Sequence, residues 1–277
     1  MLDKKVCFIG LGTMGLPMAK NIADFGYEVF AYDINKEVEL NLKGTEIKFF
    51  HTASEAALGC SLVITMLPTS CDVREALFGK KGALKNCLPN SLIIEMSTGS
   101  VKQLIRLGKD LKATGYRLID APVGRSKIEA ATGKLLVMVG GETKDVKEAN
   151  NIFKAVADQV EHVGPLGFGL KVKLVNNYMT MVNSVLTGEV LAFAQQLGLD
   201  LTTVVKILST TSAGLGELNT SYSKKALIGD FTPDFSIKMA IKDLKMALEL
   251  SSDVQNEAYF GTLAKTLFTE ATRDGLS

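Results

Sequence analysis

The chain has 277 residues, close to twice the length of a typical domain, which indicates two domains or one large α/β unit. Its 31 lysine and arginine residues balance 30 aspartate and glutamate residues at a net charge of +1, which argues against a nucleic-acid-binding protein, because such proteins need a strongly basic face. The longest apolar runs have the length of strands rather than of membrane spans, and the first residues lack the pattern of a secretory signal. We therefore expect a soluble protein of the cytoplasm.

The four cysteines indicate neither a metal site nor a disulfide framework. Cys7, Cys60, Cys71 and Cys87 are spaced like neither zinc ligands nor a Cys-x-x-Cys motif. A chain of this length also buries enough apolar surface to fold without disulfides. We expect reduced thiols and no bound metal.

The first 33 residues have the pattern of a strand, a helix and a second strand. Val6–Ile9 is a continuous apolar run that ends at a glycine, which is typical of a strand buried on both faces of a parallel sheet. A helical segment runs to Phe25 and is closed by Gly26. Tyr27–Tyr32 is predicted to form the second strand, with Asp33 at its end.

Strands and helical segments continue to alternate up to residue 164. Further strands are predicted at Leu62–Met66, Leu92–Met96, Arg117–Asp120 and Leu135–Val139, with a helical segment at Val101–Thr114. This alternation favours an α/β fold with a doubly wound sheet of the Rossmann type over residues 1–164.

The second part of the chain has helical patterns only. Helices are predicted at Leu170–Leu197, Leu201–Leu208, Asp234–Ser251 and Gln255–Arg273. The first of these is long enough to bridge two domains. We predict an all-helical domain over residues 165–277 for substrate binding and oligomerisation, and its many apolar residues indicate a homodimer or homotetramer.

A Gly-x-Gly-x-x-Gly motif separates the first strand from the first helix. Its glycines allow a tight turn, approach of the backbone to a pyrophosphate and close packing of helix on strand, while the helix N-terminus offers unpaired N–H groups. The motif alone is weak evidence. It lies between a strand and a helix, however, and Asp33 follows Gly15 by 18 residues, which favours dinucleotide binding over a chance glycine turn. The predicted cofactor contacts of this loop are Gly10, Leu11, Gly12, Thr13, Met14 and Gly15.

Asp33 predicts which cofactor is used. A carboxylate at this place accepts hydrogen bonds from the ribose hydroxyls of NAD and repels the additional phosphate of NADP. No arginine stands beside it, and the next cation is Lys36. We therefore predict that NAD is preferred to NADP; a simple turn residue is the alternative interpretation.

Lys173, Asn176 and Asn177 form a second group of candidate residues, within the long predicted helix. Because positions three and four residues apart share a helix face, Lys173 lies beside both asparagines, whereas Lys171 points elsewhere. Asparagines are poor helix formers and costly to bury unpaired, so we expect them to bind something. Contacts between helices and a solvated lysine are the alternative.

The loop Asp120–Ser126 follows a predicted strand, at the end of the sheet where open α/β folds bind ligands. Arg125 in this loop could bind an anionic group through its fork of donors, and an exposed loop cation is the alternative. The pair Lys80–Lys81 is interpreted as solvated.

These motifs, in this order, resemble the β-hydroxyacid dehydrogenase family, which includes 3-hydroxyisobutyrate dehydrogenase and tartronate semialdehyde reductase. The resemblance covers nearly the whole chain. It is carried by Gly10–Asn21 as the cofactor motif, Asp120–Gly133 as the substrate loop, Gly167–Asn177 as the catalytic motif and Phe231–Ala247 as a late motif.

The resemblance implies roles for several residues. Lys173 would be the catalytic lysine and Asn177 a substrate ligand, with Asn176 a weaker candidate beside it. Thr98 would lie beside the nicotinamide, Leu67 and Pro68 would form a wall of the cofactor cleft, and Lys242 would be a second cofactor contact.

One departure from the family pattern concerns the substrate. Most of the family has Ser-Gly-Gly where this chain has Gly124, Arg125 and Ser126. In this the chain is similar to the family's bacterial sulfolactaldehyde reductases, and a sulfonate has three acceptor oxygens that suit a guanidinium and a hydroxyl.

The expected reaction is therefore the NAD-dependent reduction of a short anionic aldehyde, 3-sulfolactaldehyde, to 2,3-dihydroxypropane-1-sulfonate, with Lys173 as general acid. 3-Hydroxyisobutyrate dehydrogenase and the tartronate or succinate semialdehyde reductases are the alternatives with a carboxylate substrate. A dinucleotide-binding scaffold without turnover is the alternative of another class.

Overall fold

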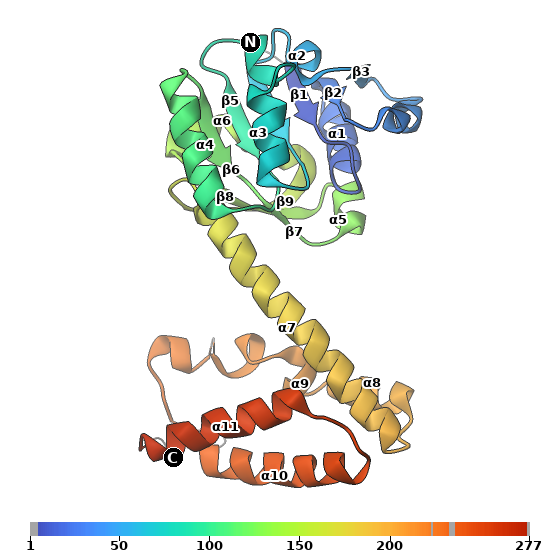
Figure 1. Cartoon of the computed structure of the whole chain (residues 1–277), viewed down its shortest axis with the longest axis vertical. Helices are drawn as coiled ribbons and strands as arrows, with labels where there is room; N and C mark the ends of the chain where they lie inside the picture. Colours follow the sequence, from blue (N-terminus) through green and yellow to red (C-terminus); the bar gives the residue numbers. More distant parts are fainter. Residues whose placement is uncertain (1–4, 223, 233–235, 276–277) are drawn as a thin grey trace. The chain divides into compact units, whose positions relative to one another are not determined.

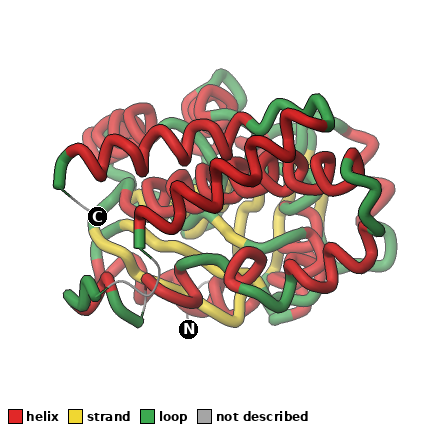
Figure 2. The backbone as a smooth tube through the Cα atoms, turned by 90° about the horizontal axis from the view of Figure 1, so that it is seen from below, coloured by secondary structure: helices red, strands yellow, loops and turns green. Residues whose placement is uncertain are grey.

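A computed structural model describes residues 5–222, 224–232 and 236–275, which divide into two compact units at Tyr178 and Met179 (Figure 1). The first unit contains one sheet of nine strands in the order β3-β2-β1-β4-β5-β6-β8-β7, with β9 paired to β8. The strands are β1 Lys5–Ile9, β2 Glu28–Tyr32, β3 Lys48–Phe50, β4 Leu62–Thr65, β5 Leu92–Glu95, β6 Arg117–Asp120, β7 Val123–Gly124, β8 Leu135–Gly140 and β9 Ala157–Gly164. Every strand of the described residues belongs to this unit. Figure 2 draws the strands in yellow and the helices in red.

Both faces of the sheet are covered by helices, which explains the continuous apolar runs of its central strands. In β1, Val6 and Phe8 belong to the core on one face, and Cys7 and Ile9 belong to the core on the other. The first core is completed by α1 and α6, and the second by α2, α3 and α4. The helices of this unit are α1 Gly15–Asp24, α2 Ala53–Ala56, α3 Ser70–Phe78, α4 Val101–Ala113, α5 Lys127–Ala131 and α6 Thr143–Val156.

The sheet is mixed in direction. Strands β1 to β6 pair in parallel, as do β8 and β9, but β8 is antiparallel to β6 and β7. The chain therefore turns back once, through β7 and α5, before β8 begins.

The second unit is helical in all its described residues. Helix α7, Phe168–Gln196, begins in the first unit and continues into the second, where α10 and α11 pack against each other. The remaining helices are α8 Leu201–Leu208, α9 Ser212–Leu215, α10 Ile237–Asp253 and α11 Tyr259–Arg273, with short 3-10 and π turns between α9 and α10. No helix among the described residues is long and apolar enough to span a membrane.

The predicted fold class is confirmed, and the predicted strands of the first part agree with the structure to within one or two residues. Three strands were not predicted, namely β3, β7 and β9. The last two helices begin later than predicted, at Ile237 and Tyr259. Asp234, the predicted start of the first of them, lies outside the described residues.

Candidate active site

A cleft of about 760 Å³ lies at the carboxyl ends of β1 and β4. The chain leaves β1 into α1 on one face of the sheet and β4 into α3 on the other, so the two loops diverge and open a crevice. Doubly wound sheets bind their ligands at this point. The lining includes Gly10, Gly12, Thr13, Met14, Gly15, Asp33, Asn35, Leu67, Pro68, Lys81, Ser97 and Thr98.

The three glycines of the motif have different surroundings, which match the demands of a bound pyrophosphate. A Cβ on Gly10 would lie 2.2 Å from the Met66 carbonyl oxygen, and a Cβ on Gly15 would lie 1.9 Å from the Gly10 carbonyl oxygen. A Cβ on Gly12 would meet no atom within 4 Å. Gly10 and Gly15 are thus required by packing, whereas Gly12 faces the open cleft and lets a ligand approach the backbone.

The N-terminus of α1 adds an electrostatic reason for an anion to bind in the cleft. The helix begins at Gly15, and its N-cap residue, Met14, makes no side-chain capping hydrogen bond. Within the first turn the N–H of Leu16 donates to the Gly12 carbonyl at 3.1 Å and Pro17 has no N–H, so the attraction for a negatively charged ligand comes from the positive end of the helix dipole.

Asp33 ends β2 and is held in place by backbone donors. Its Oδ2 accepts a hydrogen bond from the N–H of Leu11 at 2.7 Å, and its Oδ1 accepts one from the N–H of Asn35 at 2.8 Å. These bonds fix the carboxylate at the edge of the cleft, beside the glycine-rich loop.

These residues fit a nicotinamide dinucleotide. The glycine loop and the α1 N-terminus would hold the pyrophosphate, Asp33 a ribose, and the loops after β4 and β5 the part of the cofactor beyond the pyrophosphate. Of the predicted cofactor residues, Leu11 does not line the cleft; its side chain is buried and its N–H holds Asp33. Lys242 lies on α10 in the second unit, where its Nζ is 3.1 Å from Asp243 Oδ1.

One hydrogen bond joins the loops after β4 and β5, and a second one ties the loop after β5 to Glu95 at the end of that strand. The N–H of Leu67 donates to Ser97 Oγ at 2.8 Å, and the N–H of Ser97 donates to Glu95 Oε1 at 2.8 Å. Glu95 is only 4% exposed, and burial raises its pKa to about 7 although the bonds from Ser97 oppose the shift. This carboxyl group was not among the predicted site residues.

Asp120 anchors the beginning of α7. Its carboxylate is fully buried at the end of β6 and accepts hydrogen bonds from the N–H of Gly167 at 2.6 Å and of Leu170 at 2.7 Å. Burial raises the pKa of Asp120, and the two backbone donors oppose that effect. A buried acceptor at a helix N-terminus satisfies N–H groups that would otherwise lack partners, so this side chain decides where α7 starts.

Lys173 lies one turn after Leu170 on α7 and is half-buried. Burial lowers the pKa of its ammonium group. Leu170, Lys173 and Asn177 share the less exposed face of the helix, whereas Asn176 is exposed and donates from Nδ2 to Asn177 Oδ1 at 3.4 Å. The structure therefore brings Lys173 and Asn177 onto one face, with Asn176 at its side.

The loop 124–126 has contacts of its own within the first unit. Arg125 has a φ of +75° and forms an ion pair with Asp158 at 2.5 Å, while it also donates to the carbonyl of Lys134 and, at 3.3 Å, to Gln159 Oε1. Ser126 is the N-cap of α5, and its hydroxyl donates to Glu129 Oε2 at 2.6 Å. Gly124 is buried in β7.

Lys81 is the clearest residue that the sequence reading did not assign to the site. It was interpreted as part of a solvated pair, but it lies in the lining of the cleft although its side chain is exposed. It follows α3 by three residues, and no signal in the sequence connects it with the loop after β2.

Comparisons with known proteins identify the family of the chain. Residues 5–164 match the family model described as the NAD binding domain of 6-phosphogluconate dehydrogenase, and residues 167–277 match that described as NAD-binding of NADP-dependent 3-hydroxyisobutyrate dehydrogenase. The 3-sulfolactaldehyde reductase of Escherichia coli (strain K12) is 35% identical, over 98% of this chain and 91% of its own. The mitochondrial 3-hydroxyisobutyrate dehydrogenase of Homo sapiens is 29% identical, over 98% of this chain and 83% of its own.

A solved structure gives the same result. Mycobacterium tuberculosis 3-hydroxyisobutyrate dehydrogenase, solved with L-serine, superposes with a TM-score of 0.70 at 26% identity, over 98% of this chain and 94% of that one. Family models that together span nearly all of the chain, and a relative at 35% identity, are decisive. The chain belongs to the β-hydroxyacid dehydrogenase family and is an oxidoreductase that uses a nicotinamide dinucleotide as its cofactor.

Proposed function

We propose that this enzyme uses NADH to reduce 3-sulfolactaldehyde to 2,3-dihydroxypropane-1-sulfonate. The observation that carries the proposal is Arg125 in the loop after β7. Its φ of +75° lies in the left-handed region that favours glycine, the residue that most of the family has there. Strain of this kind costs roughly 1 to 3 kcal/mol and is concentrated at functional sites. A guanidinium retained under strain beside a predicted substrate site supports the binding of an anion, and the similarity to a sulfolactaldehyde reductase supports a sulfonate.

The proton of the new hydroxyl group is proposed to come from Lys173. A bound reduced nicotinamide supplies the hydride. As the carbonyl oxygen gains negative charge, the Lys173 ammonium gives it a proton and becomes a neutral amine, which water then reprotonates. Burial lowers the pKa of Lys173 and so makes this proton easier to release. Asn177, one turn along the same helix face, would orient the substrate.

The contacts of Arg125 set a condition on sulfonate binding. Asp158 and the Lys134 carbonyl occupy Nη1, so a sulfonate would use the remaining donors of the guanidinium. The Ser126 hydroxyl donates to Glu129, so a substrate would compete with Glu129 for it. The backbone N–H groups of the loop would complete the site.

The same ion pair favours a second candidate, a carboxylate-bearing semialdehyde. If Asp158 keeps the guanidinium engaged, Arg125 does not contact the anion and gives no preference for the three oxygens of a sulfonate, so the carboxylate substrates of 3-hydroxyisobutyrate dehydrogenase or of tartronate and succinate semialdehyde reductases become the candidates.

Steady-state kinetics with sulfolactaldehyde and methylmalonate semialdehyde decide between the two. We expect the wild type to prefer the sulfonate, and Arg125→Gly to raise KM for sulfolactaldehyde roughly ten- to a hundredfold, the cost of one charge-assisted contact. The variant relieves backbone strain, so loss of folding is not expected. Asp158→Asn is the matched variant, since it frees the guanidinium and should lower that KM. A wild type that prefers methylmalonate semialdehyde would replace the sulfonate by the carboxylate candidate.

Catalysis by Lys173 has its own test. Lys173→Ala should lower kcat by roughly a hundredfold or more while NADH still binds. Lys173→Arg should be equally inactive, because arginine keeps the charge but does not release its proton. Lys171→Ala is the control, since Lys171 is exposed and its Nζ lies over the Phe168 ring, 4.1 Å from the centroid. If the arginine variant retains activity, Lys173 provides charge and not a proton. A wild type that binds NADH but reduces neither aldehyde would contradict the proposed reaction.

We also propose a homo-oligomer, with domains at residues 1–164 and 165–277. The ranges of the two matching families support this boundary, although the compact first unit extends to Tyr178. Among the described residues from Met179 onward only Ala194 and Ser251 are buried, and large apolar side chains such as Met181, Val185 and Ile207 are more than half exposed. Apolar helical surface of this extent supports an interface between copies of the chain. Light scattering after size-exclusion chromatography should give a dimer or tetramer and not a monomer.

A further inference from the structure

Three neighbouring parallel strands end in a row of buried polar side chains that the proposed mechanism does not use. Thr65 in β4 is the register partner of Glu95 in β5, and Glu95 is the partner of Asp120 in β6. All three are at most 4% exposed. Two carboxyl groups side by side in the interior do not both ionise readily, so the surroundings decide which of them keeps a proton.

Asp120 is the better placed to stay ionised, because it accepts two backbone N–H bonds at the start of α7. Glu95 accepts a backbone N–H bond from Ser97, and the negative charge on Asp120 disfavours its ionisation. The Thr65 hydroxyl, on the register partner of Glu95, makes no hydrogen bond within the described part of the chain. Glu95 is therefore the member of the row whose charge changes.

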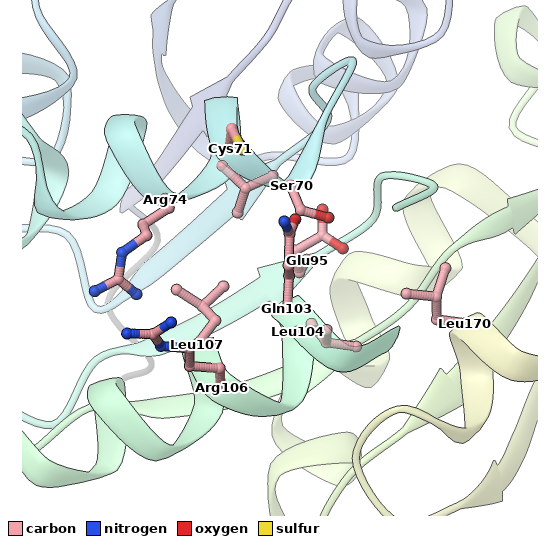
Figure 3. A pocket seen from close by; sticks show the side chains of 10 residues that line it. Ser70, Cys71, Arg74, Glu95, Gln103, Leu104, Arg106, Leu107 and Leu170 are labelled. Atoms are coloured by element: carbon pink, nitrogen blue, oxygen red, sulfur yellow. The ribbon is translucent and has the colours of Figure 1, made fainter. Parts of the chain in front are cut away.

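Glu95 also connects two cavities. Through Ser97 it holds the N–H of Leu67, and both Ser97 and Leu67 line the cofactor cleft, away from Asp33. It also lines a separate pocket of about 200 Å³ between α3 and α4. Figure 3 shows Glu95 next to Ser70 and Gln103 in this pocket, with Arg74 and Arg106 at its other end. The pocket gives solvent a route to a carboxyl group that is otherwise enclosed.

We propose that Glu95 is a positioning residue for the cofactor. Its carboxylate holds the wall formed by Leu67 and Ser97, against which the nicotinamide half of the dinucleotide binds. The carboxyl group exchanges its proton with solvent through the small pocket. The inference rests on the proposed function for the placement of that half. An ionised acceptor makes hydrogen bonds about twice as strong as a neutral one, so the wall is held more firmly when Glu95 has lost its proton.

Burial is the main cause of the pH at which this change occurs, and the charge on Asp120 raises the pKa further. Asp120 faces it from β6, and Cys71, Arg74 and Arg106 line the pocket beside it; Arg74 is already paired with Asp110 at 2.6 Å. With a pKa of about 7, Glu95 exchanges its proton near neutrality. Cofactor binding should therefore strengthen as the pH rises through about 7.

Calorimetric titration of NADH into wild type, Glu95→Gln and Glu95→Asp, from about pH 5.5 to about pH 9, tests the proposal. In the wild type we expect Kd to fall roughly three- to tenfold as pH rises. Glu95→Gln, a permanent mimic of the neutral form, should bind weakly at every pH, and Glu95→Asp should restore the pH dependence with a shifted midpoint. A glutamine variant that retains the wild-type pH dependence would refute the proposal.

Ser97→Ala provides a second measurement that leaves the buried carboxyl group in place. It breaks the link to Leu67 and should reduce NADH binding as much as Glu95→Gln does, with the double variant no worse than either single one. Additive losses would mean that the two residues act separately and would also overturn the proposal. Because NADH binding needs no aldehyde, a wild type inactive on every aldehyde would contradict the proposed function while this series still decides the role of Glu95.

Discussion

Two alanine substitutions in the glycine-rich loop should have opposite effects, because their Cβ atoms would enter different surroundings. At Gly12 the new Cβ meets no atom within 4 Å, and the residue does not have a positive φ, so the fold should tolerate Gly12→Ala. The methyl group would instead occupy the open cleft beside the expected pyrophosphate. We expect an unchanged Tm and a Kd for NADH raised roughly ten- to a hundredfold, which is about 1.4 to 2.8 kcal/mol of binding free energy.

Gly15→Ala should mainly affect stability. Its Cβ would lie 1.9 Å from the Gly10 carbonyl oxygen and 3.2 Å from Phe8 Cε1, so backbone has to move. Overpacking of this kind costs typically 1 to 3 kcal/mol, and a loss of about 2 kcal/mol lowers Tm by roughly 4 to 8 °C in a protein of this size.

Thermal unfolding followed by circular dichroism measures the effect on Tm, and calorimetry measures the binding of NADH, since the chain has no tryptophan to report it by fluorescence. The reasoning is refuted if Gly12→Ala binds NADH as the wild type does, or if Gly15→Ala is as stable as the wild type. Either result would mean that the loop does not hold the pyrophosphate in the way its packing indicates.

Three further outcomes follow from the buried and cleft carboxyl groups. Asp33→Asn should lower kcat/KM with NADH roughly tenfold and shift the ratio of NADH to NADPH use toward NADPH, because the repelling charge is gone; steady-state kinetics with both cofactors measure this. Because the pKa of Glu95 is raised to about 7, the folded state binds more protons than the unfolded state between about pH 4.5 and 7. The free energy of unfolding should therefore fall by up to about 3 kcal/mol as the pH rises through this range. Urea unfolding of wild type should show this fall, and Glu95→Gln should not. Asp120→Asn should lower both the free energy of unfolding, by about 2 kcal/mol, and kcat, since it weakens the anchor of the helix that carries Lys173; equal kcat would contradict that role.

Sequence patterns predicted the parts of the fold that are determined locally. Strands β1, β4 and β5 are buried on both faces, so their apolar runs were unambiguous. The strands that were missed are short or polar: β3 has three residues, β7 has two, and β9 pairs only with β8 and has adjacent exposed polar residues, such as Gln159 beside Asp158. Such strands exist because of the neighbours they pair with, which no local pattern records.

The candidate site also contains some residues that a local sequence pattern indicates and others that only the folded sheet brings together. The glycine motif and Asp33 were recognisable because their spacing reflects one βαβ unit. Glu95 gave no such signal, since its importance depends on register with Asp120, 25 residues later in the chain. The ion pair of Arg125 with Asp158 joins the loop after β7 to β9, 33 residues later, and only the folded sheet brings them together.

The uneven distribution of buried residues has a consequence for how the chain folds during synthesis. All the described strands, and nearly all the buried side chains, lie at or before Leu170, so the α/β unit has its complete core once this part has left the ribosome. The described helical residues that follow bury almost nothing, and in the proposed homo-oligomer they would gain stability from contacts with another copy of the chain. Assembly should therefore proceed in two steps. The rate at which the α/β unit folds should not depend on protein concentration, whereas the rate at which copies of the chain associate should depend on it.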